Sequence, residues 1–104
     1  MGIGKMTAIE REYAEYLESR KAIGEILDWN FKPIRFHLTG LCYYEPSFRV
    51  TSSDGKIHFD DVKTRFSPSD NARLQIARRL HPCEFEQIIQ RGGRWIPNKS
   101  AENT

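Results

Sequence analysis

The stretch of sequence that decides the fold runs from residue 44 to residue 63 and reads YEPSFRVTSSDGKIHFDDVK. Within it, two segments of alternating apolar and polar residues lie on either side of Ser53-Asp54-Gly55, a combination typical of a β-hairpin. The alternation predicts one strand over Tyr43–Thr51 and a second strand over Lys56–Lys63. We therefore expect a sheet that contains this hairpin.

The hairpin would gather several polar side chains on one face of the sheet. Successive side chains of a strand point to opposite faces, so Asp61 and Lys63 share a face and Asp60 points away from it. A three-residue turn would set Ser47 opposite Asp61 and Glu45 opposite Lys63. The shared face is the candidate site.

Two helices are predicted from their capping residues. Thr7 and Glu10 have the spacing of a capping box, and apolar residues recur at helical spacing over about residues 8–23. Ser67 is a second cap, followed by a proline at the first helical position, which predicts a helix over about residues 68–80. The apolar residues of this second helix lie mostly on one side, which leaves its arginines for water or a ligand.

The remaining strands complete an α/β domain. Ile26–Phe31 and Ile34–Leu38 alternate as half-buried strands do, and they would join the hairpin in a three-stranded antiparallel sheet. A last strand over Phe85–Ile89 would follow the second helix on the same, mixed sheet. The polar residues from about 92 to 104 are expected to form a poorly ordered tail.

Composition narrows the class of protein. With 104 residues the chain has room for one domain, and it has neither an apolar run long enough to span a membrane nor the apolar core of a signal peptide, so we expect a cytoplasmic protein. Cys42 and Cys83 lack metal or disulfide spacing and are expected to be buried free thiols. The net charge of +2 is small, but residues 63–94 are basic, as expected of either a solvated surface or one that follows a phosphate backbone.

The order of the elements and the motifs in them carry a family resemblance. The motifs are Tyr44-Glu45-Pro46-Ser47-Phe48, then Asp54-Gly55, then Asp61-Val62-Lys63. They resemble the PD-(D/E)XK nuclease superfamily, and more narrowly the small phage and prophage nucleases of Holliday-junction-resolvase type and the endonuclease subunits of heteromeric transposases. The resemblance covers about residues 7–91 and implies a restriction-endonuclease-like core.

The resemblance also implies a magnesium-dependent or manganese-dependent nuclease site. Asp61 and the Val62 carbonyl would be metal ligands, Lys63 the catalytic lysine and Glu10 the acid supplied by the first helix. Glu10 has an equally good structural role in the capping box with Thr7. In such a site the metal stabilises charge on the phosphate and acidifies a bound water.

Ser47 departs from the family pattern, which has an aspartate at this position. A hydroxyl removes a full negative charge from the metal site, whether by natural loss or by deliberate inactivation, so metal affinity should fall. Glu45 could lean in as a substitute ligand, although we favour a cross-strand ion pair between Glu45 and Lys63.

Four side chains of the second half are candidates for DNA binding: Arg65, Arg73, Gln75 and Arg78. Arg73 matches a basic helix position of the family, whereas Gln75 stands where a lysine is expected. The resemblance implies an endonuclease of a phage or mobile element that acts on branched or structured DNA, as a homodimer. The alternative, which Ser47 supports, is a catalytically inactive pseudo-nuclease that binds DNA or protein.

Overall fold

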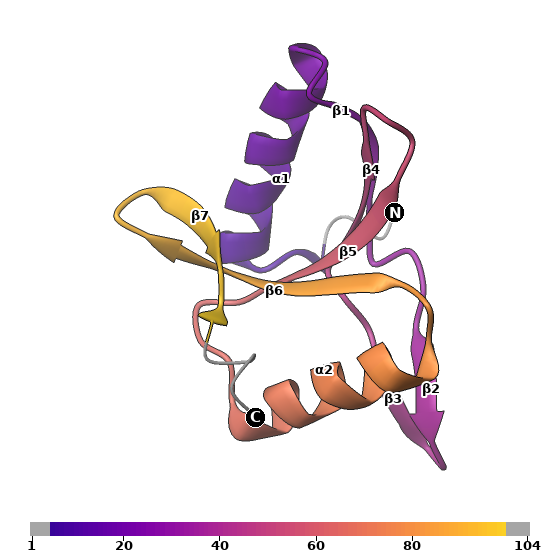
Figure 1. Cartoon of the computed structure of the whole chain (residues 1–104). Coiled ribbons are helices and arrows are strands. Elements are labelled where there is room, and N and C mark those ends of the chain that lie inside the picture. Colours follow the sequence, from indigo (N-terminus) through magenta and orange to yellow (C-terminus); the bar gives the residue numbers. More distant parts are fainter. Residues whose placement is uncertain (1–4, 100–104) are drawn as a thin grey trace.

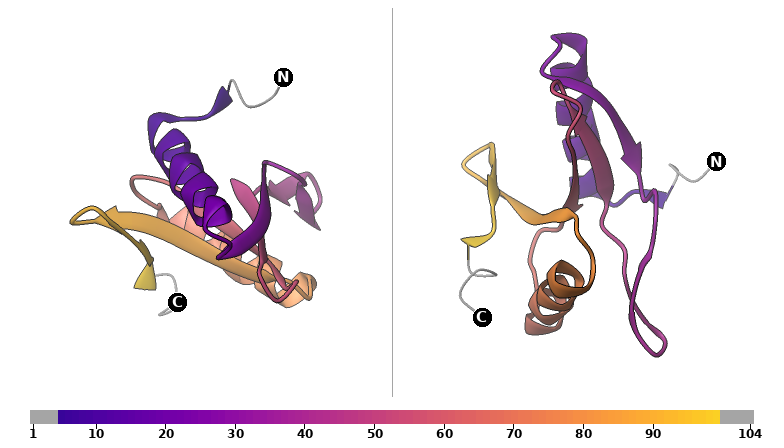
Figure 2. Two further views of the ribbon diagram at one scale, coloured as in Figure 1. Left: turned by 90° about the horizontal axis from the view of Figure 1, so that it is seen from above. Right: turned by 45° about the vertical axis from the view of Figure 1, so that its right-hand side comes forward.

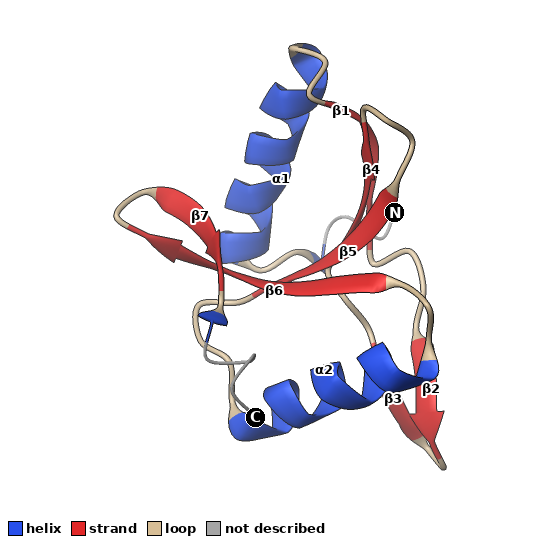
Figure 3. Cartoon of the chain, in the orientation of Figure 1, coloured by secondary structure: helices blue, strands red, loops and turns tan. Residues whose placement is uncertain are grey.

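Two helices pack on opposite faces of a mixed five-stranded sheet in the computed structural model of the chain, which describes residues 5–99 (Figures 1 and 3). In chain order the elements are α1 (Ala8–Ala22), β1 (Ile26–Phe31), β2 (Phe36–Thr39), β3 (Cys42–Tyr44), β4 (Phe48–Ser52), β5 (Ile57–Val62), α2 (Pro68–Leu80), β6 (Glu84–Arg91) and β7 (Arg94–Pro97). The predicted α/β class with a mixed sheet is confirmed. No helix within residues 5–99 is long and apolar enough to cross a membrane.

The main sheet has the strand order β1-β4-β5-β6-β7. Strands β1, β4 and β5 pair antiparallel, as predicted, but the expectation that Ile34–Leu38 joins this sheet was wrong, because β2 pairs with β3 in a separate sheet. Strand β6 pairs in parallel with β5, because α2 carries the chain back to the end of the sheet where β5 begins. Strand β5 is therefore paired on both of its edges, and Asp61 lies on it.

The predicted register of the central hairpin is confirmed. Phe48 pairs with Asp60 and Thr51 with Ile57, across a three-residue turn in which Gly55 has a φ of 88°. A left-handed φ of this kind favours glycine, which explains the residue at this turn. The same register places Ser47 beside Asp61.

The strand predicted over Tyr43–Thr51 is broken, and this prediction was wrong. The break falls at Pro46, which has no backbone N–H to donate to a ladder, and it separates β3 from β4. Strands β2 and β3 form a two-stranded sheet of their own, which we call the arm. Figure 2 shows the tip of the arm projecting beyond the main sheet, beside α2.

The C-terminal segment is more ordered than predicted. Residues Arg94–Pro97 form β7, which pairs with β6 and extends the sheet by one strand. Gly92 and Gly93, with φ values of 56° and 77°, make the tight turn that allows this pairing. Trp95 packs edge-on against Tyr13 of α1, with ring centroids 4.9 Å apart. Residues 100–104 of the predicted tail lie outside the described residues.

Both helix starts and both core layers follow from the sequence pattern. Thr7 and Ser67 are the N-cap residues of α1 and α2, as predicted, and each takes part in a capping box. The buried side chains on the α1 face include Leu17, Phe48 and Val62, and those on the α2 face include Phe59, Leu74 and Phe85. Cys42 and Cys83 are free, as predicted, but half-buried rather than buried.

Candidate functional site

The hydroxyl of Ser47 is the meeting point of two carboxylates. Ser47 Oγ lies 2.8 Å from Glu10 Oε2 and 3.1 Å from Asp61 Oδ1, and it accepts a hydrogen bond from the Val62 backbone N–H at 3.2 Å. The three side chains are buried, with exposed fractions of 6% for Glu10, 1% for Ser47 and 7% for Asp61. The structure therefore brings these three residues together.

Glu10 closes the predicted capping box and also reaches the candidate site. Its Oε1 accepts from the Thr7 backbone N–H at 2.9 Å, which closes the capping box, while Oε2 faces Ser47. The capping box therefore fixes the orientation of the carboxylate that α1 brings to the site. A carboxylate has two oxygens that can accept hydrogen bonds independently, so the two roles do not compete.

The site holds more negative charge than its own hydrogen bonds can offset. A hydroxyl carries a single proton, so Ser47 can fully satisfy only one of the two carboxylates. Burial raises the pKa of Asp61 to about 6, against the opposing effects of the Lys63 charge and the Ser47 hydrogen bond, and the charge of Glu10 adds to the increase. A buried pair of carboxylates of this kind is stabilised by a proton or by a cation.

The donor set suits a hard divalent cation. The carboxylates of Glu10 and Asp61 both approach Ser47 Oγ, and carboxylate oxygens are among the ligands that Mg²⁺ and Mn²⁺ prefer. Within residues 5–99, no group of three or more His, Cys, Asp or Glu side chains is arranged to hold a metal. The protein would therefore supply two charged ligands, and the remaining ligands would be neutral oxygens and water.

Lys63 forms an ion pair with Asp70, and the predicted pair with Glu45 was wrong. Lys63 Nζ lies 2.9 Å from Asp70 Oδ1, whereas Glu45 is exposed. The bend at Pro46 takes Glu45 out of the β4–β5 ladder, so the cross-strand position expected for it does not exist. Glu45 remains at the rim of the pocket described next.

A pocket of about 210 Å³ opens at Asp61, one of the two buried carboxylates. Its lining residues are Tyr43, Tyr44, Glu45, Asp61, Lys63, Asp70 and Arg73. The hydroxyl of Tyr44 is buried there and has no hydrogen-bond partner among the described residues. Burial and the nearby charge of Asp61 raise the pKa of Tyr44, so its hydroxyl keeps its proton and can donate to a ligand.

Only one of the four predicted DNA-binding side chains lines this pocket. Arg73 borders it, opposite Asp61 and Lys63. Arg65 lines a different hollow with Arg91, and Gln75 lies along α2 with Arg79. Arg78 donates to the backbone carbonyl of Phe85 at 2.7 Å and lies 3.9 Å from Glu86. These three are not brought to the candidate site.

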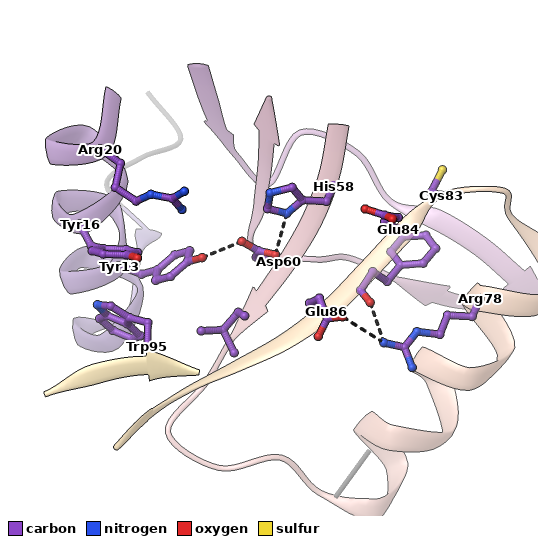
Figure 4. A pocket seen from close by; sticks show the side chains of 12 residues that line it. Tyr13, Tyr16, Arg20, His58, Asp60, Arg78, Cys83, Glu84, Glu86 and Trp95 are labelled. Carbon is purple, nitrogen blue, oxygen red and sulfur yellow. Dashed lines mark hydrogen bonds and ion pairs between the residues drawn. The ribbon is translucent and has the colours of Figure 1, made fainter. Parts of the chain in front are cut away.

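Asp60 belongs to a separate network on the α1 face of the sheet, as the strand alternation predicted. Its carboxylate accepts from the Tyr13 hydroxyl at 2.6 Å and lies 3.0 Å from His58 Nδ1 (Figure 4). The hydrogen bond to Asp60 raises the pKa of His58, and burial raises that of Tyr13. The pocket in Figure 4 has a volume of about 600 Å³ and mixes acidic, basic and aromatic side chains.

Sequence reasoning missed two features, the Asp60 network and the Lys63–Asp70 pair. The Asp60 network had a local signal, because His58 and Asp60 are two residues apart on one strand and share a face. The Lys63–Asp70 pair had a weaker signal, since Asp70 is the acidic residue of the predicted cap at Ser67.

The chain matches no protein-family model, no curated protein and no solved structure.

Proposed function

We propose that the chain is a metal-dependent DNA endonuclease of the PD-(D/E)XK type, with a restriction-endonuclease-like core. The observation that carries the proposal is the convergence of Glu10 and Asp61 on Ser47, where Asp61 also lines a pocket with Lys63 and Arg73. Buried carboxylates beside exposed cations suit a site in which a phosphate group and a divalent cation meet.

In this proposal each residue has a stated role. Glu10, Asp61 and the Val62 carbonyl hold Mg²⁺ or Mn²⁺, which when bound acidifies a water and stabilises charge on the phosphate. Lys63 and Arg73 line the pocket as cations and bind phosphate oxygens. Lys63 is also positioned to orient the attacking water once its pairing with Asp70 is exchanged for the substrate.

The resemblance of the motifs extends the proposal to the substrate and the setting. Small nucleases of this type come from phages and mobile elements, so we propose branched or structured DNA as the substrate and the host cytoplasm as the location. A domain with one site spans only one strand of a duplex, which favours a homodimer. Each of these statements rests on the nuclease assignment.

The deciding experiment uses purified protein with plasmid and four-way-junction DNA, in Mg²⁺, Mn²⁺ or EDTA. The expected result is metal-dependent cleavage that is lost in Asp61→Ala and retained in Asp54→Ala, a change of an exposed aspartate in the β4–β5 turn. Circular dichroism confirms that both variants fold. Cleavage that persists in Asp61→Ala would contradict the assignment of this site.

The second candidate is a pseudo-nuclease that binds DNA or protein without cleaving. The observation that favours it is that the Ser47 hydroxyl bonds both carboxylates while Lys63 is paired with Asp70, so the site is partly satisfied without a ligand. Binding of DNA without cleavage under every metal condition would select this candidate.

Ser47→Asp separates the two candidates further. The added carboxylate restores the third charge, so cleavage should appear or increase strongly if the site is a nuclease centre lacking a ligand. Three buried carboxylates repel one another without a cation, so the same variant should lose stability in EDTA and regain it in Mg²⁺. A variant that is folded in Mg²⁺ and gains no stability or cleavage would count against the geometry proposed here.

A further inference from the structure

The outer face of the arm carries a stacked cation and aromatic ring beside the candidate site. The guanidinium of Arg35 lies 4.4 Å from the centroid of the Tyr43 ring, and the His37 ring contacts the same tyrosine at 5.3 Å. Arg35, His37 and Tyr43 are exposed. Tyr43 also lines the pocket that contains Asp61.

The inner face of the arm packs against the rest of the domain. Phe36, Leu38 and Tyr44 are buried against α2, and the His81 ring bonds the backbone carbonyl of His37 at 2.9 Å. A surface that is already ordered loses little conformational entropy on binding. The exposed stack is therefore a preformed surface rather than a loose pair of side chains.

The charge of the arm fits a phosphate chain. Between Lys32 and Tyr44 the sequence contains Lys32 and Arg35 and no acidic residue. In the pocket, Lys63 and Arg73 lie among the acidic Glu45, Asp61 and Asp70, so a phosphate there would be bound by the two cations and by the unpartnered hydroxyl of Tyr44. A strand of nucleic acid could thus follow the arm with a phosphate in the pocket and a base at the stack.

We propose that the Arg35–Tyr43 stack binds an unpaired base next to the phosphate held in the Asp61 pocket. Bases stack on tyrosine rings and on guanidinium planes, and only an unpaired base exposes a face for this. The inference deepens the proposed function, on which it rests for the phosphate site, because it specifies DNA with a single-stranded segment rather than a continuous duplex.

The test is an anisotropy titration in EDTA, so that cleavage plays no part, with a duplex that has a single-stranded overhang and the same duplex with blunt ends. The expected result is preference for the overhang, and a loss of about tenfold in that affinity for Tyr43→Ala. Tyr43→Phe keeps the ring and should bind within about twofold of the natural protein. Arg35→Lys keeps the charge but loses the plane, so it should bind more weakly than Tyr43→Phe.

The chain supplies a matched control on α1. Arg20 lies 5.5 Å from the Tyr16 ring centroid, and Tyr16 is 37% exposed against 39% for Tyr43, but this pair borders the Asp60 network. Tyr16→Ala should therefore leave overhang binding unchanged. A 2-aminopurine in the overhang should be quenched by the natural protein and by Tyr16→Ala, and not by Tyr43→Ala.

The outcomes separate this inference from the nuclease proposal. Equal binding of both duplexes, or equal losses in Tyr43→Ala and Tyr16→Ala, would overturn the stacking surface while leaving metal-dependent cleavage to be judged by Asp61→Ala. Overhang binding that needs Tyr43, in a protein that never cleaves, would support the stacking surface and reject the nuclease. Leu41 lies at the tip of the arm and is 94% exposed. If the protein shows no preference for the overhang, and if it self-associates in a way that Leu41→Asp abolishes, the arm would instead be a contact between copies of the chain.

Discussion

The ammonium group of Lys63 is held 2.9 Å from the carboxylate of Asp70, the residue that closes the capping box of α2. Asp70 Oδ2 accepts from the Ser67 backbone N–H at 2.8 Å, so one carboxylate both starts the helix and positions the lysine. Although partial burial opposes ionisation, the Ser67 N–H and Lys63 lower the pKa of Asp70. The start of α2 thus determines where the cation of the candidate site lies.

Asp70→Asn should release Lys63 without removing the cap. Asparagine keeps an acceptor for Ser67 but loses the charge that pairs with Lys63, so DNA affinity should rise, by at most about fivefold because exposed ion pairs contribute about 1 kcal/mol or less. Asp28→Asn is the control, since it makes the same charge change in the exposed Lys21–Asp28 pair. Equal gains in anisotropy titrations of both variants would indicate a general effect of charge.

Thr7→Ala should connect helix capping to metal binding. Loss of the cap should reduce the free energy of unfolding by about 1 kcal/mol, and Ser67→Ala should cost a similar amount at α2. Only Thr7→Ala loosens Glu10, so only that variant should also show weaker Mn²⁺ binding by calorimetry. Similar Mn²⁺ affinities for the two variants would contradict a role of the capping box in placing Glu10.

Ser47→Ala should destabilise the fold, because three buried groups share this hydroxyl. Removal of one partner from buried polar groups costs about 1 to 3 kcal/mol, and urea unfolding in EDTA measures it. Ser19→Ala removes an exposed hydroxyl that bonds the Tyr16 carbonyl, and it should change stability by less than about 0.5 kcal/mol. A cost for Ser47→Ala no greater than that for Ser19→Ala would show that the hydroxyl is not the centre of the network.

Asp61 should make the metal-free protein less stable as the pH rises. Its pKa is about 6 in the folded chain against 3.8 as the ordinary value, so the stability associated with the protonated carboxyl is complete below pH 3.8 and is lost as the pH rises through 6. The loss amounts to about 3 kcal/mol. Asp61→Asn should lack this pH dependence in EDTA, and parallel curves for the two proteins would contradict the raised pKa.

His58 should contribute stability at the acidic side of neutrality. The hydrogen bond to Asp60 raises its pKa above 6.5, so its contribution is complete below that value and disappears as the pH rises through the folded-state pKa. The difference in unfolding free energy between the natural protein and His58→Gln should therefore be greater at pH 6 than at pH 8.5. A difference that does not change with pH would exclude the Asp60–His58 ion pair.

Local signals predicted much of this molecule. The register of β4 and β5 and the caps at Thr7 and Ser67 were correct because each depends on residues close together in sequence. Turn length sets a hairpin register, and caps depend on spacings of three residues. The meeting of Asp61 with Ser47 followed from that register.

Features that depend on tertiary packing were missed. Glu45 was predicted to lie opposite Lys63 because the strand was assumed to be continuous, but the strand is interrupted at Pro46. Lys63 instead forms its ion pair with Asp70, which belongs to a different element. Gly92 and Gly93 were interpreted as the start of a tail, although two glycines also permit a tight turn. The turn is stabilised by the packing of Trp95 on Tyr13, a contact that no local sequence pattern indicates.

The parallel pairing of β5 with β6 has a consequence for how the chain folds. Glu10 and Ser47 are 37 residues apart, and β5 acquires its second neighbour only after α2 and β6 have been synthesised. Contacts between distant segments form slowly, because the loops between them must close first. On the ribosome, the carboxylates of Glu10 and Asp61 are therefore synthesised before the strand that completes the pairing of β5, so the candidate site can assemble fully only after β6 has emerged.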